Sequence, residues 1–436
     1  MAAFDAHRPP AQELVDDCVH CGFCLPTCPT YALWGEEMDS PRGRIQLMQQ
    51  GLDGEPMTDS MVTHIDRCLG CMACVTACPS GVQYNSLIEA TRGQIERRYD
   101  RSPGQRFLRE AIFALFPYPR RLRAMRAPLA LYQRSGAPRL LRRSGLLDRL
   151  PGTLRAMESL APPLEPAQRL PQRIPAQGTR RAVVGMLTGC VQSVFFPHVN
   201  SATARVLAAE GCDVIVPKGQ GCCGALSVHN GREEEAAAFA RRTIDAFERA
   251  GVDAVVVNSA GCGSSMKEYG DLLQDDRAYA DRAARLAGTV RDVAEFLAEL
   301  GPAAPRHPLP LRVAYHDACH LGHAQGVRAQ PRQLLAGIPG LDVAEIAEAE
   351  LCCGSAGIYN LLNPEAAGEL GDRKTGNILA TGADLLVTAN PGCIMQISAA
   401  AARRGAALPA AHTVEVLDAS LRGLPARQLT DARTAP

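Results

Sequence analysis

Short apolar runs alternate with amphipathic helical spacing along the second half of the chain. Apolar runs at 182–187, 214–216 and 254–257 predict short buried strands, and the spacing over 199–210 predicts a helix between the first two. Three further apolar runs repeat this order, at 311–315, 341–343 and 385–388. Strands that alternate with helices are typical of an α/β fold with mainly parallel strands. We therefore expect two successive α/β units.

Cysteines recur together with these predicted strands. The first set reappears 129 to 131 residues later, and each set contains an adjacent cysteine pair followed by glycine. The two sets are Cys190, Cys222, Cys223 and Cys262, and then Cys319, Cys352, Cys353 and Cys393. Adjacent side chains on an extended strand point to opposite faces, so each pair must lie on a turn to converge, and Gly224 and Gly354 supply permissive backbone. The repeat predicts a duplicated domain, called here the CCG domain after its Cys-Cys-Gly sequence.

The first and last cysteine of each set, Cys190, Cys262, Cys319 and Cys393, closely follow a predicted strand, and ligands gather at the carboxyl ends of strands in open α/β sheets. We interpret each set as a metal or cofactor site made by loops; the alternative is that the cysteines are small buried apolar residues. The second set has additional polar neighbours, namely His316, Asp317, His320 and His323. The first copy has Leu187 where the second has His316. The second site is thus suited to redox-linked proton transfer, although each histidine could instead hydrogen-bond loop backbone.

The front of the chain carries a different cysteine repeat. The pattern C-x2-C-x2-C-x3-C-P occurs twice, displaced by 50 residues. Three thiols at this spacing converge on one cluster, whereas the fourth serves the other cluster. We predict two [4Fe–4S] clusters with crossed ligation, one held by Cys18, Cys21, Cys24 and Cys78, the other by Cys68, Cys71, Cys74 and Cys28. A zinc site needs no trailing proline and a redox C-x-x-C needs only two cysteines, so both are disfavoured.

Arginines lie close to these motifs in the sequence. A cubane with four thiolates carries a net negative charge, which Arg42, Arg44 and Arg67 are placed to offset. The alternative for each of these residues is a solvated surface charge. We interpret His20 and His64, which flank the motifs, as packing or surface residues and not as ligands.

The segment between the two repeats has a distinct composition. Residues 92–181 contain twenty arginines against six acidic residues, a net charge of +14. Prolines break the segment into short amphipathic helices, which we expect to end near Pro117, Pro119, Pro128 and Pro138. Arginine with aromatic residues favours an interface, either with an acidic flavin subunit or, through residues 104–150, with anionic lipid head groups. The alternative is a folded linker whose charges are solvated.

Composition sets the class of protein. The chain has 436 residues, 17 cysteines and a formal charge of zero, which excludes a nucleic-acid binder that acts through total charge. With no apolar secretory core and no run long enough to span a membrane, we expect a cytoplasmic protein, in which clustered cysteines indicate metal or redox chemistry. We predict four regions: a ferredoxin-type domain (1–100), a helical linker (101–180) and two CCG domains (181–305 and 306–436). The expected fold class is therefore a multidomain α+β and α/β protein.

These motifs together resemble those of the iron–sulfur subunit of bacterial glycolate oxidase, over nearly the whole chain. The supporting phrases are DSPRGRI (39–45), GCCGAL (221–226), YHDACHLGHAQG (315–326), LCCGSAG (351–357) and NPGC (390–393). The resemblance implies FAD-containing partner subunits that oxidise glycolate to glyoxylate and pass electrons through this chain toward the membrane quinone pool. We therefore expect the protein to be cytoplasmic and to associate peripherally with the inner face of the cell membrane.

The chain itself contains no convincing flavin or nicotinamide motif, so we assign it no catalytic residue and expect FAD only on partner subunits. Three alternatives stay open. The chain could serve a related complex that oxidises glycerol 3-phosphate or lactate, or act as a heterodisulfide-reductase-like enzyme at Cys319 and the Cys352–Cys353 pair. It could also be an assembly scaffold whose CCG domains bind partners.

One departure from the related heterodisulfide-reductase pattern concerns the CCG sites. Those CCG domains end in C-x2-C, whereas this chain has Ser265 and Gln396 at the last position. A noncubane double cluster that needs five thiolates is therefore disfavoured. An ordinary [4Fe–4S] cluster on four cysteines, or an empty site, stays open for each CCG domain.

Overall fold

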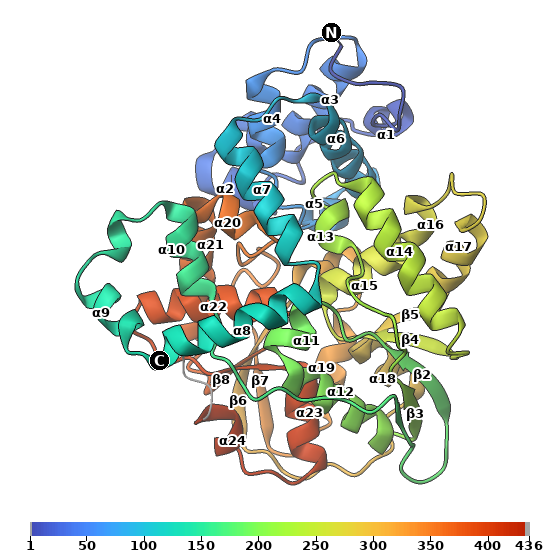
Figure 1. Ribbon diagram of the computed structural model, residues 1–436, viewed down its shortest axis with the longest axis vertical. Helices are drawn as coiled ribbons and strands as arrows, with labels where there is room; N and C mark the ends of the chain where they lie inside the picture. Colours follow the sequence, from blue (N-terminus) through green and yellow to red (C-terminus); the bar gives the residue numbers. More distant parts are fainter. Residues whose placement is uncertain (1, 432–436) are drawn as a thin grey trace.

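The computed structural model describes residues 2–431, apart from the side chains of residues 139, 142, 143 and 148. The last five residues of the predicted second CCG domain, 432–436, lie outside the described residues. Figure 1 shows the N-terminal helices at one end of the molecule, the two sheets toward the opposite end, and the linker helices running between them. The mixed helical and α/β architecture agrees with the predicted fold class.

The N-terminal region is helical, as predicted for a ferredoxin-type domain. Its helices are α1 (Gln12–Asp16), α2 (Pro29–Trp34), η1 (Glu37–Asp39), α3 (Pro41–Leu52), α4 (Asp59–Asp66), α5 (Ala73–Ala77) and α6 (Tyr84–Arg98). Helix α3 begins where the Ser40 hydroxyl accepts a hydrogen bond from the Gly43 amide at 3.1 Å, with Pro41 in the first turn. Buried Ile45, Met48 and Ile65 form a core onto which the cysteine loops pack.

The linker forms α7 (Pro103–Leu115), α8 (Pro119–Arg134), α9 (Ala137–Arg143), η2 (Leu147–Arg149) and α10 (Gly152–Leu160). The expectation that every proline breaks a helix is wrong at Pro128, which lies inside α8. Pro138 lies in the first turn of α9, directly after the break between α8 and α9. An interior proline removes one backbone hydrogen bond. Helix α8 continues because both sides of Pro128 are anchored: Arg126 donates to the carbonyl oxygens of Val194 and Glu165, and Gln133 donates to that of Pro162.

Two sheets follow, and they have the same strand order. The first is β1-β3-β2-β4-β5, with β1 (Arg173–Ile174), β2 (Ala182–Met186), β3 (Cys212–Ile215), β4 (Ala254–Val257) and β5 (Val290–Asp292). The second is β7-β6-β8-β9, with β6 (Leu311–His316), β7 (Leu341–Ala344), β8 (Leu385–Thr388) and β9 (Ala410–His412). Every pairing is parallel except that of β1 with β3. The predicted duplication and parallel strands are confirmed.

Helices surround both sheets. In the first copy they are α11 (Val191–Phe195), α12 (Pro197–Ala209), α13 (Ala225–Val228), α14 (Glu233–Glu248), α15 (Ala260–Lys267), α16 (Tyr269–Leu272), α17 (Ala280–Thr289) and α18 (Val293–Leu300). In the second they are the π-helix η3 (His320–Ala324), α19 (Ala329–Ala336), α20 (Tyr359–Leu362), α21 (Pro364–Leu379), α22 (Pro391–Arg403), α23 (Thr413–Leu421) and α24 (Arg427–Thr430).

The two copies share one apolar core, so they are packed together and not strung apart. Val184 and Val256 of the first sheet lie in the same buried cluster as Val313 and Val387 of the second. Arg205 of α12 makes a two-pronged contact with Asp418 of α23, at 2.8 and 2.6 Å. The strand ends of both copies are thereby held in a fixed relation.

The turn that carries the second cysteine pair requires glycine. Gly354 has φ +87°, and a Cβ at this position would lie 2.7 Å from the Ala367 carbonyl oxygen. We expect Gly354→Ala to cost more than about 1 kcal/mol and to lower the melting temperature, because an L side chain is strained there. The matched control is Gly368→Ala within α21, where a Cβ meets nothing within 4 Å and alanine favours the helix. Equal melting temperatures for the two variants would contradict the assignment.

Candidate iron–sulfur sites

The eight front cysteines lie on two tightly coiled loops and on the short helices that adjoin them. Cys18, Cys21 and Cys24 lie between α1 and α2, Cys68 and Cys71 lie between α4 and α5, and Cys74 lies within α5. His20 and Met72 adopt left-handed backbone conformations, with φ of 53° and 62°, which curl each loop around its thiols. Cys28 is the N-cap residue of α2 and Cys78 the C-cap residue of α5.

Thiols from the two loops influence one another. Burial raises the pKa of Cys18, and thiolates on Cys78 and Cys21 raise it further. Burial likewise raises the pKa of Cys74 well above its usual value, with further contributions from Cys68 and Cys28. Each trio thus has the distant fourth cysteine as a neighbour, an arrangement compatible with crossed ligation. The ligand sets themselves stay a prediction.

Crowded, buried thiols of this kind suit an iron–sulfur cluster, because only a bound cation would relieve the repulsion among several thiolates. Cys68 already favours the thiolate. Although burial opposes ionisation, the Arg44 and Arg92 guanidinium groups lower the pKa of Cys68 below its usual value. The Gly70 amide donates to the Cys68 sulfur at 3.3 Å, and the Tyr84 hydroxyl does so at 3.7 Å.

The buried Arg44 belongs to a network around Asp39. The Arg44 side chain is 1% exposed, lies 3.4 Å from the Asp39 carboxylate and donates to the His64 carbonyl oxygen at 2.6 Å. Asp39 also contacts Arg67 and the His64 ring, each at 2.9 Å. Arg44 is therefore a buried positive charge beside the Cys68 thiol. Arg67 and His64 instead contact the Asp39 carboxylate, which holds Arg44 in place.

Arg42 lies nearer the other group of thiols. Its guanidinium pairs with Glu37 at 2.6 and 3.1 Å and donates to the His20 carbonyl oxygen at 3.1 Å. The His20 residue is exposed. Arg42 opposes the effect of burial on the pKa values of Cys18 and Cys24.

In the first CCG domain, the Cys222–Cys223 pair lies on the predicted turn. Gly224 has φ +92°, and its amide donates to the Cys222 sulfur at 3.4 Å. The neighbouring Cys190 thiol holds the pKa of Cys222 well above its usual value, and hydrogen bonds from Cys222 and Cys262 hold the pKa of Cys223 well below. The structure therefore brings the four predicted thiols of this copy together.

The second CCG domain gathers its thiols around His316. The Cys319 and Cys352 sulfurs are 3.9 Å apart. Ligand atoms of His316, Cys353 and Cys393 lie within 4.8 Å of one another, and all three residues are buried. Burial, with the nearby Lys374 ammonium, lowers the pKa of His316 well below its usual value, so the ring is neutral.

The other polar neighbours predicted for this site have different roles. Asp317 pairs with Arg332 at 2.8 and 2.7 Å. His323 hydrogen-bonds the Glu350 carbonyl oxygen at 3.2 Å and Thr76 of α5 at 2.7 Å, so it connects the CCG domain to the ferredoxin-type domain. The Nδ1 atom of His320 lies 3.5 Å from the Cys319 sulfur. The interpretation of His323 as a backbone partner is confirmed.

The front sites and the second CCG site touch. Burial raises the pKa of Cys71 well above its usual value, and a thiolate on Cys319 raises it further. Cys71 and Leu69 share an apolar cluster with Cys352, Tyr359 and Cys319. No local sequence pattern predicts this contact, because Cys71 and Cys319 lie in separate motifs far apart in the chain.

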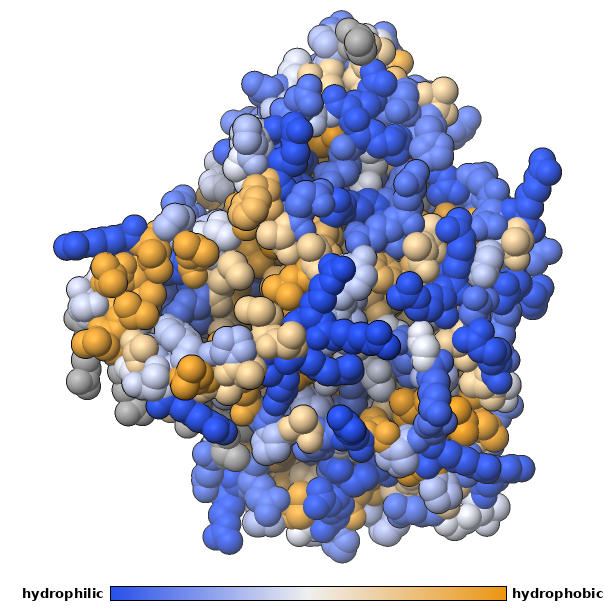
Figure 2. Space-filling model, viewed as in Figure 1, coloured by the Kyte–Doolittle hydropathy of each residue, from blue (hydrophilic) through white to orange (hydrophobic). Residues whose placement is uncertain are grey.

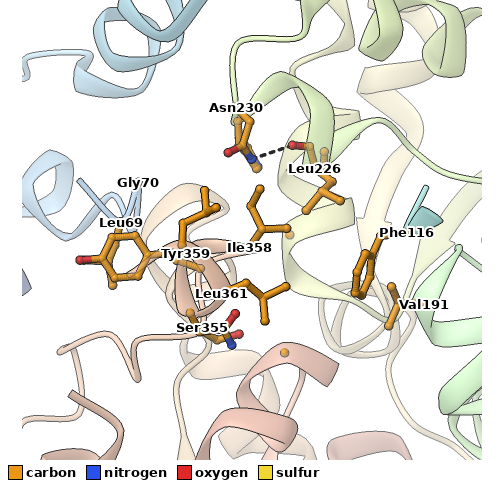
Figure 3. A pocket seen from close by; sticks show the side chains of 18 of the residues that line it. Leu69, Gly70, Phe116, Val191, Leu226, Asn230, Ser355, Ile358, Tyr359 and Leu361 are labelled. Atoms are coloured by element: carbon orange, nitrogen blue, oxygen red, sulfur yellow. Dashed lines mark hydrogen bonds between the residues drawn. The ribbon is translucent and has the colours of Figure 1, made fainter. Parts of the chain in front are cut away.

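A cavity of about 640 Å³ lies where the ferredoxin-type domain, the linker and both CCG domains meet. The four cysteines of each CCG domain and Cys68 line it. Figure 3 shows Leu226, Ile358 and Leu361 converging on this space, with Phe116 of the linker and Val191 on another side. The cavity is thus lined both by cysteine thiols and by apolar side chains.

A polar group that sequence reasoning missed lines another part of the wall. The His229 ring lies 2.7 Å from the Glu89 carboxylate and contacts the His320 ring at a tilt of 51°, with ring centroids 5.1 Å apart. Nearby, Asn85 donates to Glu268 at 3.0 Å, and burial raises the pKa of Glu268 to about 7. Glu89 and His229 come from different regions, so only the folded chain brings them together.

The fold and its thiol sites define an iron–sulfur protein with a ferredoxin-type domain and a duplicated cysteine-rich domain. Family comparisons agree with this class. Residues 14–82 match a 4Fe-4S dicluster domain, residues 184–267 and 313–398 match a cysteine-rich domain, and residues 104–161 match the linker region of the glycolate oxidase iron–sulfur subunit.

The chain belongs to the family of glycolate oxidase iron–sulfur subunits. It is 40% identical to the probable glycolate oxidase iron–sulfur subunit of Bacillus subtilis (strain 168), over 92% of this chain and 93% of that protein. It is 37% identical to the glycolate oxidase iron–sulfur subunit of Escherichia coli (strain K12), over 89% and 91%. The family resemblance stated from the sequence is confirmed, as is the expectation of a subunit of an oxidoreductase.

Two other similarities are more distant. Lactate utilization protein A of Macrococcus caseolyticus (strain JCSC5402) is 33% identical over 56% of this chain and 99% of that protein. A crystal structure of a hypothetical protein from Helicobacter pylori superposes with a TM-score of 0.52 at 10% identity, covering 90% of this chain and 75% of that one. The latter similarity concerns the fold alone. Within the described residues, we find no helix long and apolar enough to cross a membrane.

Removing the buried charge of Arg44 should change the redox behaviour of a front cluster. A reduced cluster carries one more negative charge, so Arg44→Met should disfavour reduction and lower a midpoint potential, by on the order of 60 mV for each ~1.4 kcal/mol of lost attraction. Potentiometric titration monitored by EPR measures this shift. Arg106→Gln is the control, since the Arg106 side chain is 64% exposed and its contacts are with the Asp100 carboxylate and the Arg101 carbonyl oxygen, away from the cysteines. Unchanged potentials in Arg44→Met would contradict the role assigned to this charge.

Proposed function

We propose that this chain is the electron-transfer subunit of a flavin-dependent glycolate dehydrogenase. It accepts electrons from FAD-containing subunits that oxidise glycolate to glyoxylate and passes them toward quinone. The observation that carries this proposal is the continuity of thiol sites from the front loops to the second CCG domain, at the contact of Cys71 with Cys319 and Cys352. A chain that only supported assembly would have no need of adjoining redox sites.

We assign the two front clusters to the crossed sets: Cys18, Cys21, Cys24 and Cys78 for the first, and Cys68, Cys71, Cys74 and Cys28 for the second. When bound, the clusters supply one-electron transfer. The protein's own residues hold them in buried loops, oppose their negative charge with Arg42 and Arg44, and donate hydrogen bonds to sulfur from Gly70 and Tyr84.

The first cluster site is the side from which a flavin donor is expected to approach. Cys21 is the one exposed residue among the eight front cysteines. Val19 and Phe23 beside it are each 67% exposed. Exposed apolar side chains next to an exposed ligand favour a contact with a partner protein. The second cluster site is buried and faces the CCG domains, which gives the path a direction.

The cavity supports the acceptor side of the proposal. A quinone has an apolar ring and tail with two carbonyl groups, and the cavity combines apolar walls with a thiol-rich end near His229 and Glu89. Reduction of a quinone takes up two electrons and two protons. The hydrogen-bonded His229 and Glu89 side chains are of the types that accept and donate protons.

Redox titration of the purified chain tests the donor side. We expect its clusters to be reduced by dithionite but not by glycolate alone, and to be reduced by glycolate once the FAD-containing subunits are added. Visible bleaching and EPR follow the reduction. Reduction by glycolate without any flavin subunit, or failure in its presence, would contradict the proposal.

The same assembly tests the acceptor side through Ala161, which lines the cavity from the linker. Ala161→Trp fills that space, so we expect slower reduction of a soluble quinone with unchanged cluster reduction by glycolate. Ala161→Ser, which changes the volume little, serves as the control. Equal quinone reduction in both variants would place the acceptor elsewhere.

We further propose that the linker rests on the membrane surface at the inner face of the cell membrane. Figure 2 shows apolar side chains gathered over α9 and α10. This linker apolar patch consists of Leu140, Leu146, Leu150, Leu154 and Met157, each between 37% and 71% exposed. Met157 also lines the cavity, so the patch adjoins the place where an apolar acceptor would enter. The +14 charge of residues 92–181 favours anionic lipid.

Flotation with phosphatidylglycerol vesicles tests this surface. We expect the full chain to float with the vesicles at low salt and to be released progressively by added salt, because salt screens the arginine attraction. The triple variant Leu140→Ser, Leu146→Ser and Leu154→Ser should lose most of the binding. Leu379→Ser, on α21 and 38% exposed, is the matched control. Binding that survives the triple variant, or that occurs only with the FAD-containing subunits present, would contradict the lipid assignment.

A further inference from the structure

The His316 imidazole has no hydrogen-bond partner for either of its ring nitrogens. The residue ends strand β6 and is 1% exposed. Both Nδ1 and Nε2 are buried and unpaired among the described residues. Leaving a buried polar group unsatisfied destabilises the folded state, so such groups in native proteins call for an explanation.

Two charged side chains near His316 are hydrogen-bonded elsewhere. The Lys374 ammonium donates to the carbonyl oxygens of Glu348 and Ala349. Asp317, the next residue in the chain, is bound by Arg332. What His316 does face is sulfur: one of its nitrogens lies within 4.8 Å of the Cys353 and Cys393 sulfurs, which lie equally close to each other. Three ligand atoms this close to one another could hold a metal ion.

A comparison of the two CCG domains shows that this arrangement is not a general feature of the duplicated fold. The position of His316 is occupied in the first copy by Leu187, which packs into an apolar cluster with Cys223. The two copies thus share four thiols, but only the second adds a nitrogen donor at the end of its first strand.

In the second copy, Gln396 occupies the position where related CCG domains have a fifth cysteine, and its side chain is not free to bind a metal. Gln396 is 3% exposed, and its amide nitrogen donates to the Ala367 carbonyl oxygen at 2.7 Å. Its amide oxygen accepts a hydrogen bond from Asn360 at 3.1 Å. The Gln396 side chain is therefore used for packing α22 against α20 and α21, and His316 is left as the additional candidate ligand.

We propose that His316 is an iron ligand in the second CCG domain, where it completes a mixed cysteine and histidine cluster site with Cys319, Cys352, Cys353 and Cys393. The first CCG site has the apolar Leu187 at the corresponding position. This inference deepens the proposed electron-transfer function and rests on it for its meaning, although the ligation itself does not depend on the flavin partner.

A histidine ligand has a definite electronic consequence. Imidazole is neutral where a thiolate is negative, and replacing thiolate ligands with histidine raises the reduction potential of an iron–sulfur centre. The second CCG site would then hold electrons more favourably than a site whose fifth ligand were a thiolate. In the proposed electron path this site lies beside Cys71 and the cavity, so a higher potential there would favour electron transfer toward the acceptor.

Pulsed EPR of the full chain tests the ligation without any activity measurement. In dithionite-reduced chain carrying ¹⁵N-labelled histidine, we expect one cluster signal to show a strong coupling to the histidine nitrogen. His316→Leu, which copies the first CCG domain, should lose that coupling while the front-cluster signals remain and report correct folding. His323→Gln is the matched control, because His323 is bound to Glu350 and Thr76, and the coupling should persist there.

A second variant covers the case in which His316→Leu does not fold. His316→Cys keeps a ligand at the position, so we expect iron content to be retained, the nitrogen coupling to vanish and the midpoint potential of that cluster to fall. Absence of the nitrogen coupling in the labelled wild-type chain would overturn the proposal. Unchanged iron content and spectra in Cys353→Ser would also overturn it, because they would show that the site holds no iron. Neither result would change the reduction of the front clusters by glycolate and the FAD-containing subunits. A wrong assignment of His316 can therefore be told apart from a wrong proposal of electron transfer.

Discussion

The mutual repulsion of buried thiolates is the interaction on which this structure depends. Sixteen of the cysteines meet in small groups on loops, and most of them are withdrawn from water. Burial and close thiol neighbours both oppose ionisation, as at Cys74, unless a cation is present. The protein prepares the thiolate form only in part, through Arg44 and Arg92 at Cys68. The rest of the favourable charge must come from bound iron, so cluster binding and folding of these loops are expected to be coupled.

The same constraint explains the arrangement of the domains. Anionic clusters are costly beside one another in an apolar interior, yet electron transfer requires that they adjoin. The chain resolves this by interposing interior cations and short-range hydrogen-bond donors, with Arg44 fixed by Asp39 and Asp39 fixed in turn by Arg67 and His64. The linker then closes the junction with apolar side chains such as Phe116, which leaves a cavity beside the thiols.

Duplication gave two similar sites that have since diverged in chemistry. Both copies retain strand order, cysteine pair and left-handed glycine, at Gly224 and Gly354. One difference close to the thiols is Leu187 in the first copy and His316 in the second. An apolar residue there completes a core, whereas an imidazole without hydrogen-bond partners faces sulfur. A shared fold therefore supports two different environments for the same four thiols.

The sequence by itself determined the family, the duplicated cysteine patterns and the longer strands, because spacing and hydrophobic periodicity are local properties. It missed β1, β5 and β9, which have two or three residues and so carry no periodic signal. It also misjudged Pro128, where side-chain anchors outside α8 outweigh a local preference. Only the tertiary structure decided that Cys71 meets Cys319, that Glu89 meets His229, and that His316 faces Cys353 and Cys393. Such contacts join residues far apart in the chain, and they arise from packing that no local pattern encodes.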